Sequence, residues 1–285
     1  MTRRSTRRST RAHAARGAAC TIATLAVAAL AAAPAAAGIH YRSVTRTEAE
    51  NQKPQAIAVE GWVEGASAKI AFHESGNPVA PAGSYLLTRD GGATVLLVDP
   101  EEKTYAEWDL EAMLASVGSM MQAMGPLLNI EIAGIEVEKL AEEPGGTIHG
   151  LPTTHVRYRT SYDMVIRVLG MRRANAVEQV QDIWATDALA DVGLGVWLRK
   201  APKTGFGELD ELIAAEVGKV QGVALKMTQV STTTGEKGKR SSVTRTTMEV
   251  TELERALTIP PATFEVPAGY TRTEIAMPMA GGPGG

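Results

Sequence analysis

Apolar and polar residues alternate along most of the chain after residue 54, in short segments that turn residues separate. A period of two is typical of a strand with one buried face, and turn residues between such segments indicate hairpins. In the first segment Val59 and Val63 share one face, and Trp62 lies on the other. The sequence Asp-Gly-Gly at 90–92 separates two later segments and is a hairpin signal.

These segments predict a mainly β fold of the α+β kind: a large curved antiparallel sheet or half-open barrel with two or three helices packed on one face. Gly134 interrupts the alternation and predicts a bulge. A hairpin loop is expected at 235–238, and 188–200 is compatible with either a short helix or a loop. The expected strands are 57–64, 68–73, 85–89, 94–98, 104–108, 129–140, 153–162, 164–169, 177–185, 223–232, 241–253 and 263–266.

The period changes to that of a helix in two places. Over 110–124, apolar residues recur at three- and four-residue spacing. Asp109 can cap the start of this helix, and the Gly-Pro pair at 125–126 stops it. A second amphipathic helix is expected over 207–217, with its apolar residues on one side.

Residues 1–37 have the order of a secretory signal peptide: a basic stretch, an apolar run and then small residues. We expect cleavage between Ala37 and Gly38, and a mature chain that is periplasmic or secreted. An uncleaved membrane anchor and an organellar transit peptide are the alternatives that stay open. Cys20, the single cysteine of the chain, lies inside the signal, so the mature chain has neither a disulfide nor a thiolate site.

The rest of the chain divides simply. Residues 38–53 are polar and without periodicity, and we expect them to form a lead-in linker. No Pro- or Ser-rich linker interrupts 54–274, which predicts a single β-rich domain. The low-complexity residues 275–285 are expected to be a disordered tail. No apolar run after the signal is long enough to predict a transmembrane segment.

The formal net charge of −3 hides an uneven distribution. Residues 1–37 hold six arginines and no acid, so the remaining chain carries a net charge of −9. An acidic surface argues against a nucleic-acid partner, because phosphate contacts need clustered Lys and Arg. The partners we expect are a lipid or other apolar small molecule, or a protein of the cell envelope. No cofactor is expected.

Four segments carry a resemblance to a known family. They are 86–92 (LLTRDGG), 98–105 (VDPEEKTY), 148–155 (IHGLPTTH) and 264–270 (FEVPAGY). Together they resemble the DUF4412 family of exported bacterial proteins over most of 54–270. The strand order with inserted helices also resembles the broader LolA-like group, whose half-open barrels shelter lipid or acyl chains. The resemblance implies such a barrel in this chain and brings no catalytic residues with it.

Candidate catalytic and metal-binding residues are few. His149 and His155 are six residues apart, which matches no compact metal-ligand motif. We therefore interpret them as a turn histidine and a polar strand-face histidine, and predict no metal site. A Ser-His-Asp triad could be drawn from Ser84, His73 and Asp90, but no Gly-x-Ser-x-Gly elbow supports it. We expect no catalytic residues and no enzyme activity.

Two arginines share one strand face. Arg157 and Arg159 could meet an anionic head group or an acidic partner. The interpretation we favour is a solvated outer face, on which they pair with Glu136 and Glu138, because such surface pairs are common and weak.

The methionines of 110–124 are the strongest indication in the sequence of a ligand-binding site. Thioether side chains are flexible and polarizable, and they suit an adaptable apolar groove. If this helix packs over the concave face of the sheet, its apolar side lines a cavity; ordinary core packing is the other interpretation. The predicted ligand-binding residues are Met113, Val117, Met120, Met121 and Met124, with Trp62, Phe72 and Trp184 as walls.

Together these patterns predict a non-enzymatic exported protein that binds a lipid or other apolar ligand between the curved sheet and the Met-rich helix. The alternative is an envelope protein-interaction or stress-sensing module with no small-molecule ligand. The two hypotheses differ in what they require of the inner side of the sheet, which must accept a ligand only in the first.

Overall fold

The computed structural model describes residues 38–50, 52–77, 80–107, 128–169, 171–189, 203–219, 221–238 and 240–274. The predicted signal at 1–37, the predicted tail at 275–285 and the predicted Met-rich helix at 110–124 lie outside the described residues, as does most of 188–200. Within the part that the structure describes, no helix is both long enough and apolar enough to cross a membrane.

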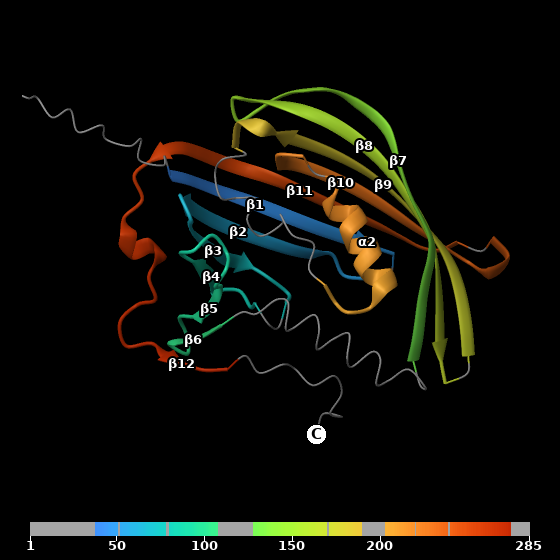
Figure 1. The fold of residues 1–285 in the computed structure, drawn as a ribbon, viewed down its shortest axis with the longest axis horizontal. Helices are drawn as coiled ribbons and strands as arrows, with labels where there is room; N and C mark the ends of the chain where they lie inside the picture. The colour runs from blue at the N-terminus through green and yellow to red at the C-terminus, as the bar shows by residue number, and fades with distance from the viewer. Residues whose placement is uncertain are drawn as a thin grey trace, which may run out of the picture. The chain divides into compact units, whose positions relative to one another are not determined.

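The described chain forms one sheet of 12 strands, which confirms the mainly β class and the large curved sheet (Figure 1). Every neighbouring pair is antiparallel except β12 and β6, which are parallel. The order across the sheet is β12-β6-β5-β4-β3-β2-β1-β11-β10-β9-β8-β7. The strands are β1 Gly38–Ala49, β2 Gln55–Glu64, β3 Ser67–Glu74, β4 Tyr85–Thr88, β5 Leu96–Asp99, β6 Thr104–Glu107, β7 Leu128–Ile148, β8 Leu151–Val168, β9 Met171–Thr186, β10 Val223–Gly235, β11 Arg240–Leu257 and β12 Thr271–Arg272.

The lead-in linker expected at 38–53 is wrong, because most of it forms β1 in the middle of the sheet. β1 pairs with β2 on one side and with β11 on the other. Both sets of backbone groups are thus satisfied by neighbouring strands, and the strand does not need a continuous apolar face of its own. Hydropathy alone does not reveal a polar strand that is held in this way.

The structure also tests three other predictions about strands and bulges. The two strands predicted at 153–162 and 164–169 are one continuous strand, β8. The bulge predicted at Gly134 is confirmed, since the β7–β8 register shifts between Ala133 and Glu136. The strand predicted at 263–266 is wrong: Pro261–Phe264 forms the 3-10 turn η4, in which proline occupies the first turn and cannot donate to a ladder.

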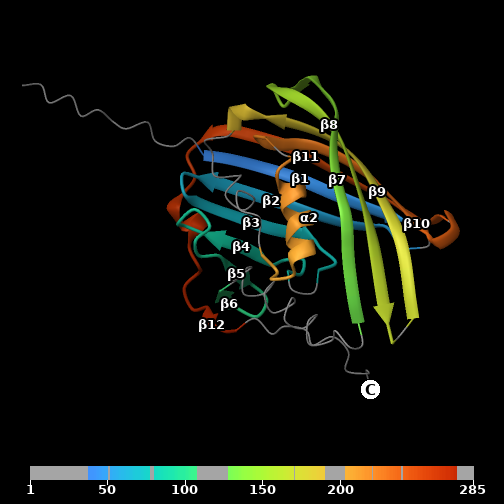
Figure 2. The ribbon, with the colours of Figure 1, turned by 45° about the vertical axis from the view of Figure 1, so that its right-hand side comes forward.

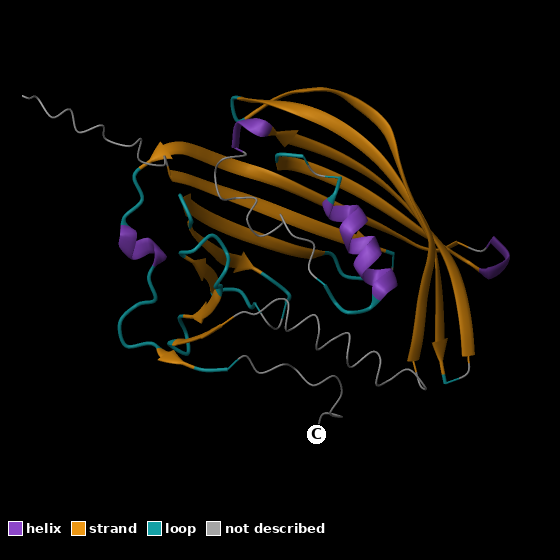
Figure 3. Ribbon diagram, in the orientation of Figure 1, coloured by secondary structure: helices purple, strands orange, loops and turns teal. Residues whose placement is uncertain are grey.

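The described residues contain one α-helix, α2 (Gly207–Val217), at the position predicted for the second helix (Figure 3). The Thr204 amide and hydroxyl both donate to the Asp210 carboxylate, at 2.6 Å and 2.7 Å, and so fix the chain just before the helix. α2 contacts β7 and lies on the inner side of the curved sheet in both ribbon views (Figure 2). The remaining short elements are the 3-10 turns η1 (Asp187–Leu189) and η3 (Glu236–Gly238).

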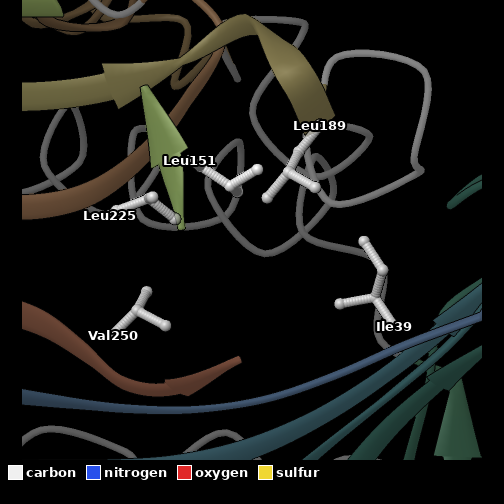
Figure 4. Packing of buried hydrophobic residues seen from close by; sticks show 5 residues of the cluster. All are labelled: Ile39, Leu151, Leu189, Leu225 and Val250. Atoms are coloured by element: carbon white, nitrogen blue, oxygen red, sulfur yellow. The ribbon is translucent and has the colours of Figure 1, made fainter. Parts of the chain in front are cut away.

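The sheet curls so far that one end of β8 meets β1 and β11. Side chains from β1, β8, η1, β10 and β11 point toward one another in a single apolar cluster (Figure 4). His149, in the turn between β7 and β8, donates from Nε2 to the Val250 carbonyl oxygen at 2.7 Å and ties this turn to β11. The cluster closes one end of the sheet's concave side. Its buried members are Ile39, Leu151, Leu189, Leu225 and Val250.

We call this concave side the inner face, and the opposite side the outer face. A second core lies on the outer face, where residues 258–270 cover β3 to β6. Ile259 and Phe264 pack there against Tyr85, Leu87 and Val98, all of them buried. Both faces of the sheet therefore carry apolar packing, but the covering elements differ.

Candidate functional site

A further apolar cluster lies on the inner face next to its closed end. Val156 pairs with Ile183, and Ile183 pairs with Met227 on the next strand, so these three side chains point to the same side of the sheet. They belong with Tyr158 to a further apolar cluster, in which Ile183 is 1% exposed. Only the register of β8, β9 and β10 brings these side chains together.

Burial shifts the pKa of two tyrosines on the inner face. Burial raises the pKa of Tyr41 to about 12. Burial, followed by the nearby Glu216 carboxylate of α2, raises the pKa of Tyr162. The Tyr41 ring packs directly on Gly61 of β2, where a Cβ atom would lie 2.1 Å from Tyr41 Cε1. The close approach of ring and backbone explains why this strand position holds glycine.

Two buried polar atoms on the inner face lack hydrogen-bond partners among the described residues. They are Thr160 Oγ1 and Gln181 Oε1, on neighbouring strands, and their residues are 0% and 7% exposed. The amide nitrogen of Gln181 donates to Gln229 Oε1 at 3.3 Å and lies 3.1 Å from Met227 Sδ. A buried polar atom without a partner costs about 1–3 kcal/mol, so this pair is an unusual feature of the inner face.

The three predicted aromatic walls do not line one surface. Phe72 pairs with Val59 and belongs to the inner face, while Trp62 pairs with His40 and Trp184 pairs with Lys226 on the outer face. Trp62 and Trp184 stand four strand spacings apart, about 19 Å across the sheet. The other predicted ligand residues lie outside the described residues: Met113, Val117, Met120, Met121 and Met124.

The outer face carries a charged cluster around Glu60, whose side chain is 12% exposed. Glu60 Oε1 accepts from His40 Nε2 at 2.7 Å and from Arg42 Nη2 at 3.1 Å, and Oε2 accepts from His73 Nε2 at 2.7 Å. Burial acts to raise the pKa of this carboxyl group, but the hydrogen bonds from the two histidines and the arginine outweigh it and lower the pKa to about 2. Glu60 is therefore a carboxylate with every oxygen satisfied.

A second cluster of similar composition, with one histidine in place of two, lies on β8, β9 and β10. Asp182 Oδ1 is 2.8 Å from His155 Nε2 and 3.2 Å from Arg157 Nε. The His155 ring stacks on Trp184 with centroids 4.5 Å apart, and Lys226 Nζ lies 5.0 Å from the centre of the Trp184 ring. In the Glu60 cluster, the His40 ring is tilted against Trp62 with centroids 5.3 Å apart, and Lys69 Nζ lies 5.4 Å from the centre of the Trp62 ring.

The histidine pair and the triad considered from the sequence are not assembled in either cluster. His149 binds the Val250 carbonyl and His155 binds two carboxylates, so the two histidines do not converge. Among the described residues, no three His, Cys, Asp or Glu side chains are placed to hold a metal ion. The residues of the conceivable triad are separate: Ser84 Oγ donates to the Pro81 carbonyl and His73 binds Glu60.

Arg157 and Arg159 lie on the outer face, in agreement with the interpretation that they belong to a solvated outer surface. Arg159 Nη1 is 2.9 Å from Glu138 Oε2, which confirms one of the predicted surface pairs. Arg157 differs from the prediction, because it contacts Asp182 on β9 and not Glu136. Sequence reasoning missed Glu60, Asp182 and Lys226 because their partners stand on neighbouring strands, and only the strand register brings them together.

A cavity of about 730 Å³ lies on the outer face, between β4 to β6 and the covering segment 264–270. Its floor is apolar, with Leu87, Leu96 and Tyr105, while Arg89 and Asp90 contribute polar groups to its rim. Asp90 already accepts from the Thr88 hydroxyl and the Thr94 amide, and these bonds lower the pKa of its carboxyl group. This cavity is the alternative location for a small apolar ligand.

No family model matches the chain, and no curated protein sequence matches it. Among solved structures, the chain is similar to a LolA superfamily protein of Nitrosomonas europaea, with 9% identity, a TM-score of 0.29, and coverage of 80% of this chain and 90% of that one. It is also similar to an uncharacterised conserved protein of Thermus thermophilus, with 10% identity, a TM-score of 0.30, and coverage of 82% and 90%. A DUF1329 family protein of Desulfovibrio piger shows 10% identity, a TM-score of 0.31, and coverage of 81% and 90%. TM-scores this low do not support an inference from those proteins to this chain.

Proposed function

We propose that this protein is a non-enzymatic exported protein that holds an apolar or amphiphilic ligand, such as a lipid, against the inner face of its curved sheet. The observation that carries the proposal is the combination of apolar clusters with two buried, unpartnered polar atoms on that one face. A ligand with an apolar body and a polar group could pack against the apolar side chains and also supply hydrogen bonds to the two polar atoms.

The polar atoms narrow the chemistry of the ligand. Gln181 Oε1 is an acceptor, and Thr160 Oγ1 can accept or donate. A ligand group that donates hydrogen bonds, such as a hydroxyl or an amide, therefore suits this pair better than a carboxylate does. Fatty alcohols, acylglycerols and acyl amides have such groups, and plain hydrocarbons and free fatty-acid anions do not.

The outer face supports this role less well. Its two charged clusters satisfy their own hydrogen bonds, so a ligand would have to displace a bond already made. The outer cavity has room for a ligand, but among the residues described around it no buried side-chain atom lacks a partner. The inner face is the surface on which binding would supply missing hydrogen bonds.

Export is the second part of the proposal. β1 begins at Gly38, the residue that follows the predicted cleavage site, so removal of 1–37 would leave every described strand whole. Gly38 is buried and pairs with Leu257, which favours a mature chain that starts at or before this residue. N-terminal sequencing of protein secreted by a bacterial host tests this point, and a start later than Gly38 contradicts it.

Ligand binding is tested with protein purified from its cellular compartment, by organic extraction and by titration with the apolar fluorophore Nile red. We expect co-purified lipid, and displacement of Nile red by monooleoylglycerol. Protein that yields no lipid and binds no Nile red overturns the proposal.

Two matched variants locate the site. Thr160→Val keeps the side-chain shape and removes the unpartnered hydroxyl, and it should weaken monooleoylglycerol binding about five-fold, the value of one hydrogen bond. Tyr105→Leu alters the outer cavity and should leave the affinity unchanged. If only Tyr105→Leu weakens binding, the ligand lies in the outer cavity and the inner-face assignment is wrong.

The second candidate function is a protein-interaction module, which the sheet edge favours. β7 is the last strand at one end of the sheet, is 21 residues long, and exposes Val137 and Leu140. A long edge strand can accept a strand from a partner. Two results together would favour this second candidate. The wild-type protein captures an envelope protein that the Val137→Lys variant does not capture, and organic extraction yields no lipid.

A further inference from the structure

The turn between β8 and β9 exposes large apolar side chains that contact no core. Leu169 is 70% exposed and Met171 is 67% exposed, more than any other large apolar residue that the structure describes. Val168, at the end of β8, is 40% exposed. Exposed apolar groups gathered at the tip of a long hairpin are unfavourable in water, and they commonly mark a contact surface.

The backbone at this tip adds a second unfavourable feature. Leu169 has a φ of +49°, in the left-handed region that glycine and asparagine occupy most easily. A leucine here is disfavoured both by its conformation and by its exposure. Leu169 belongs to none of the apolar clusters of the described residues, so packing within the fold does not account for a leucine at this position.

Three arginines surround the apolar tip. Arg167 stands directly opposite Arg172 across the β8–β9 pair, and Arg173 stands opposite Ile166 on the other side of the ribbon. Like charges directly opposite each other on a sheet repel, so this pair is costly in isolation. The guanidinium groups thus lie on both sides of the hairpin, immediately behind the exposed apolar residues.

Acidic neighbours hold two of these arginines in place. Arg167 bonds Glu131 and Asn129 of β7, and Arg172 Nη1 lies 2.6 Å from Glu236 Oε1 in η3. Arg173 is exposed, and within the part of the chain that the structure describes it makes no ion pair. Arginine suits phosphate groups particularly well, because its planar fork can bond two oxygens at once.

We propose that the β8–β9 tip docks the protein on an anionic phospholipid surface, with Leu169 and Met171 entering the acyl region and the arginines meeting the phosphates. An apolar tip behind which cationic side chains gather matches the layered chemistry of a membrane surface. The mature chain carries a net charge of −9, so attraction to the surface must come from this local group and not from the molecule as a whole.

The position of the β8–β9 tip connects docking with the proposed ligand site on the inner face. Docking itself does not require a ligand at that site. β8 starts at the closed end of the inner face, with Leu151, and ends at the tip, with Val168 (Figure 1). Docking at the tip therefore turns the closed end of the inner face away from the membrane. A ligand could then enter from the membrane side.

The test is co-sedimentation of the purified protein with sucrose-loaded vesicles. We expect binding to vesicles of phosphatidylcholine with phosphatidylglycerol, and much weaker binding to phosphatidylcholine alone. The double variant Leu169→Ser with Met171→Ser should lower vesicle affinity about ten-fold or more, as expected when buried apolar side chains are removed. Arg172→Gln with Arg173→Gln should lower affinity for the anionic vesicles and remove the preference for them.

Matched controls separate docking from general effects. Ile57→Ser removes an exposed apolar side chain from β2, and Arg272→Gln removes an exposed cation from β12. Neither should change vesicle binding. The proposal is overturned if the wild-type protein sediments with neither kind of vesicle, or if the tip variants bind vesicles as well as wild type does. It is also overturned if only the control variants lose binding. Nile red titration of the tip variants should match wild type, so failure of docking is distinguishable from failure of ligand binding.

Discussion

The two faces of the sheet differ in whether their buried polar groups have hydrogen-bond partners. On the outer face, Glu60 is a buried carboxylate with three charged or ring nitrogen partners, and Asp182 has a histidine and an arginine. On the inner face, Thr160 and Gln181 are neutral and less costly to bury, yet each keeps one atom without a partner among the described residues.

This difference separates structural chemistry from candidate functional chemistry. A buried ionised group must be paired because its desolvation is expensive, so completed clusters on the outer face indicate structural roles. An unpaired neutral atom costs about 1–3 kcal/mol, which a fold can tolerate where something else will meet it. The inner face is therefore the better place to look for a ligand.

The largest effect is expected from the apolar core of either face. Leu225→Ala on the inner face and Leu87→Ala on the outer face each truncate a leucine that is at most 2% exposed. Each should lower the free energy of unfolding by about 2–5 kcal/mol in urea titrations, because the removed methyl groups leave a cavity. A loss below about 1 kcal/mol for one of the two would show that its face is loosely packed.

Breaking the Glu60 cluster should produce a pH-dependent effect. The pKa of Glu60 is about 2 in the folded protein, below the ordinary value of 4.5, so its ionised form is bound more tightly there. That stabilisation is complete above pH 4.5 and is lost as the pH falls toward 2. Glu60→Gln should therefore cost about 3 kcal/mol near neutral pH and progressively less in acid.

The comparison between wild type and Glu60→Gln is made by urea titration at several pH values. Glu178→Gln, which removes an exposed carboxylate of β9, is the matched control and should show no such trend. A constant difference between wild type and Glu60→Gln down to pH 2 would contradict the assigned hydrogen bonds.

Thr160→Val should change stability in the opposite direction. Replacing a buried hydroxyl that has no partner by a methyl group of the same shape removes a desolvation cost, so we expect a gain of about 1 kcal/mol in the ligand-free protein. Thermal unfolding of protein stripped of lipid measures this. A loss of stability would mean that the hydroxyl has a partner within the fold, and the case for a ligand at this position would weaken.

The smallest effect is expected at the rim of the Asp182 cluster. The Arg157 side chain is half exposed, so its ion pair with Asp182 is screened by water. Arg157→Gln should lower the free energy of unfolding by less than about 1 kcal/mol, and the loss should shrink in high salt. A loss as large as that of Glu60→Gln would show that the two clusters stabilise the sheet equally.

Alternation in the sequence predicted the class of fold and, in some strands, which side chains share a face. It placed Arg157 and Arg159 on one strand face, and it separated Trp62 from Val63, because period two is a local property of a strand. Applied to 183–185, the same reasoning would have put Trp184 on the outer face and removed it from a shared wall with Phe72. The sequence pattern did contain that signal.

What could not be predicted depends on contacts between distant segments. The strand β1 looked like a linker because its partners, β2 and β11, supply what its own sequence lacks. Glu60 gains His40 and His73 only once β1 and β3 flank β2 in the observed register. Likewise, nothing in the local sequence around His149 predicts a bond to Val250, which lies 101 residues further along.

The pairing of β1 with β11 has a consequence for the order of folding. Gly38 lies opposite Leu257, so the first strand of the sheet receives its second neighbour only after nearly the whole domain has been synthesised. Contacts this distant in sequence slow folding, because the intervening chain must be ordered first. Until β11 arrives, β1 presents an open strand edge, and such edges promote aggregation. Chains truncated before Arg240 should therefore aggregate and fail to accumulate as smaller folded domains.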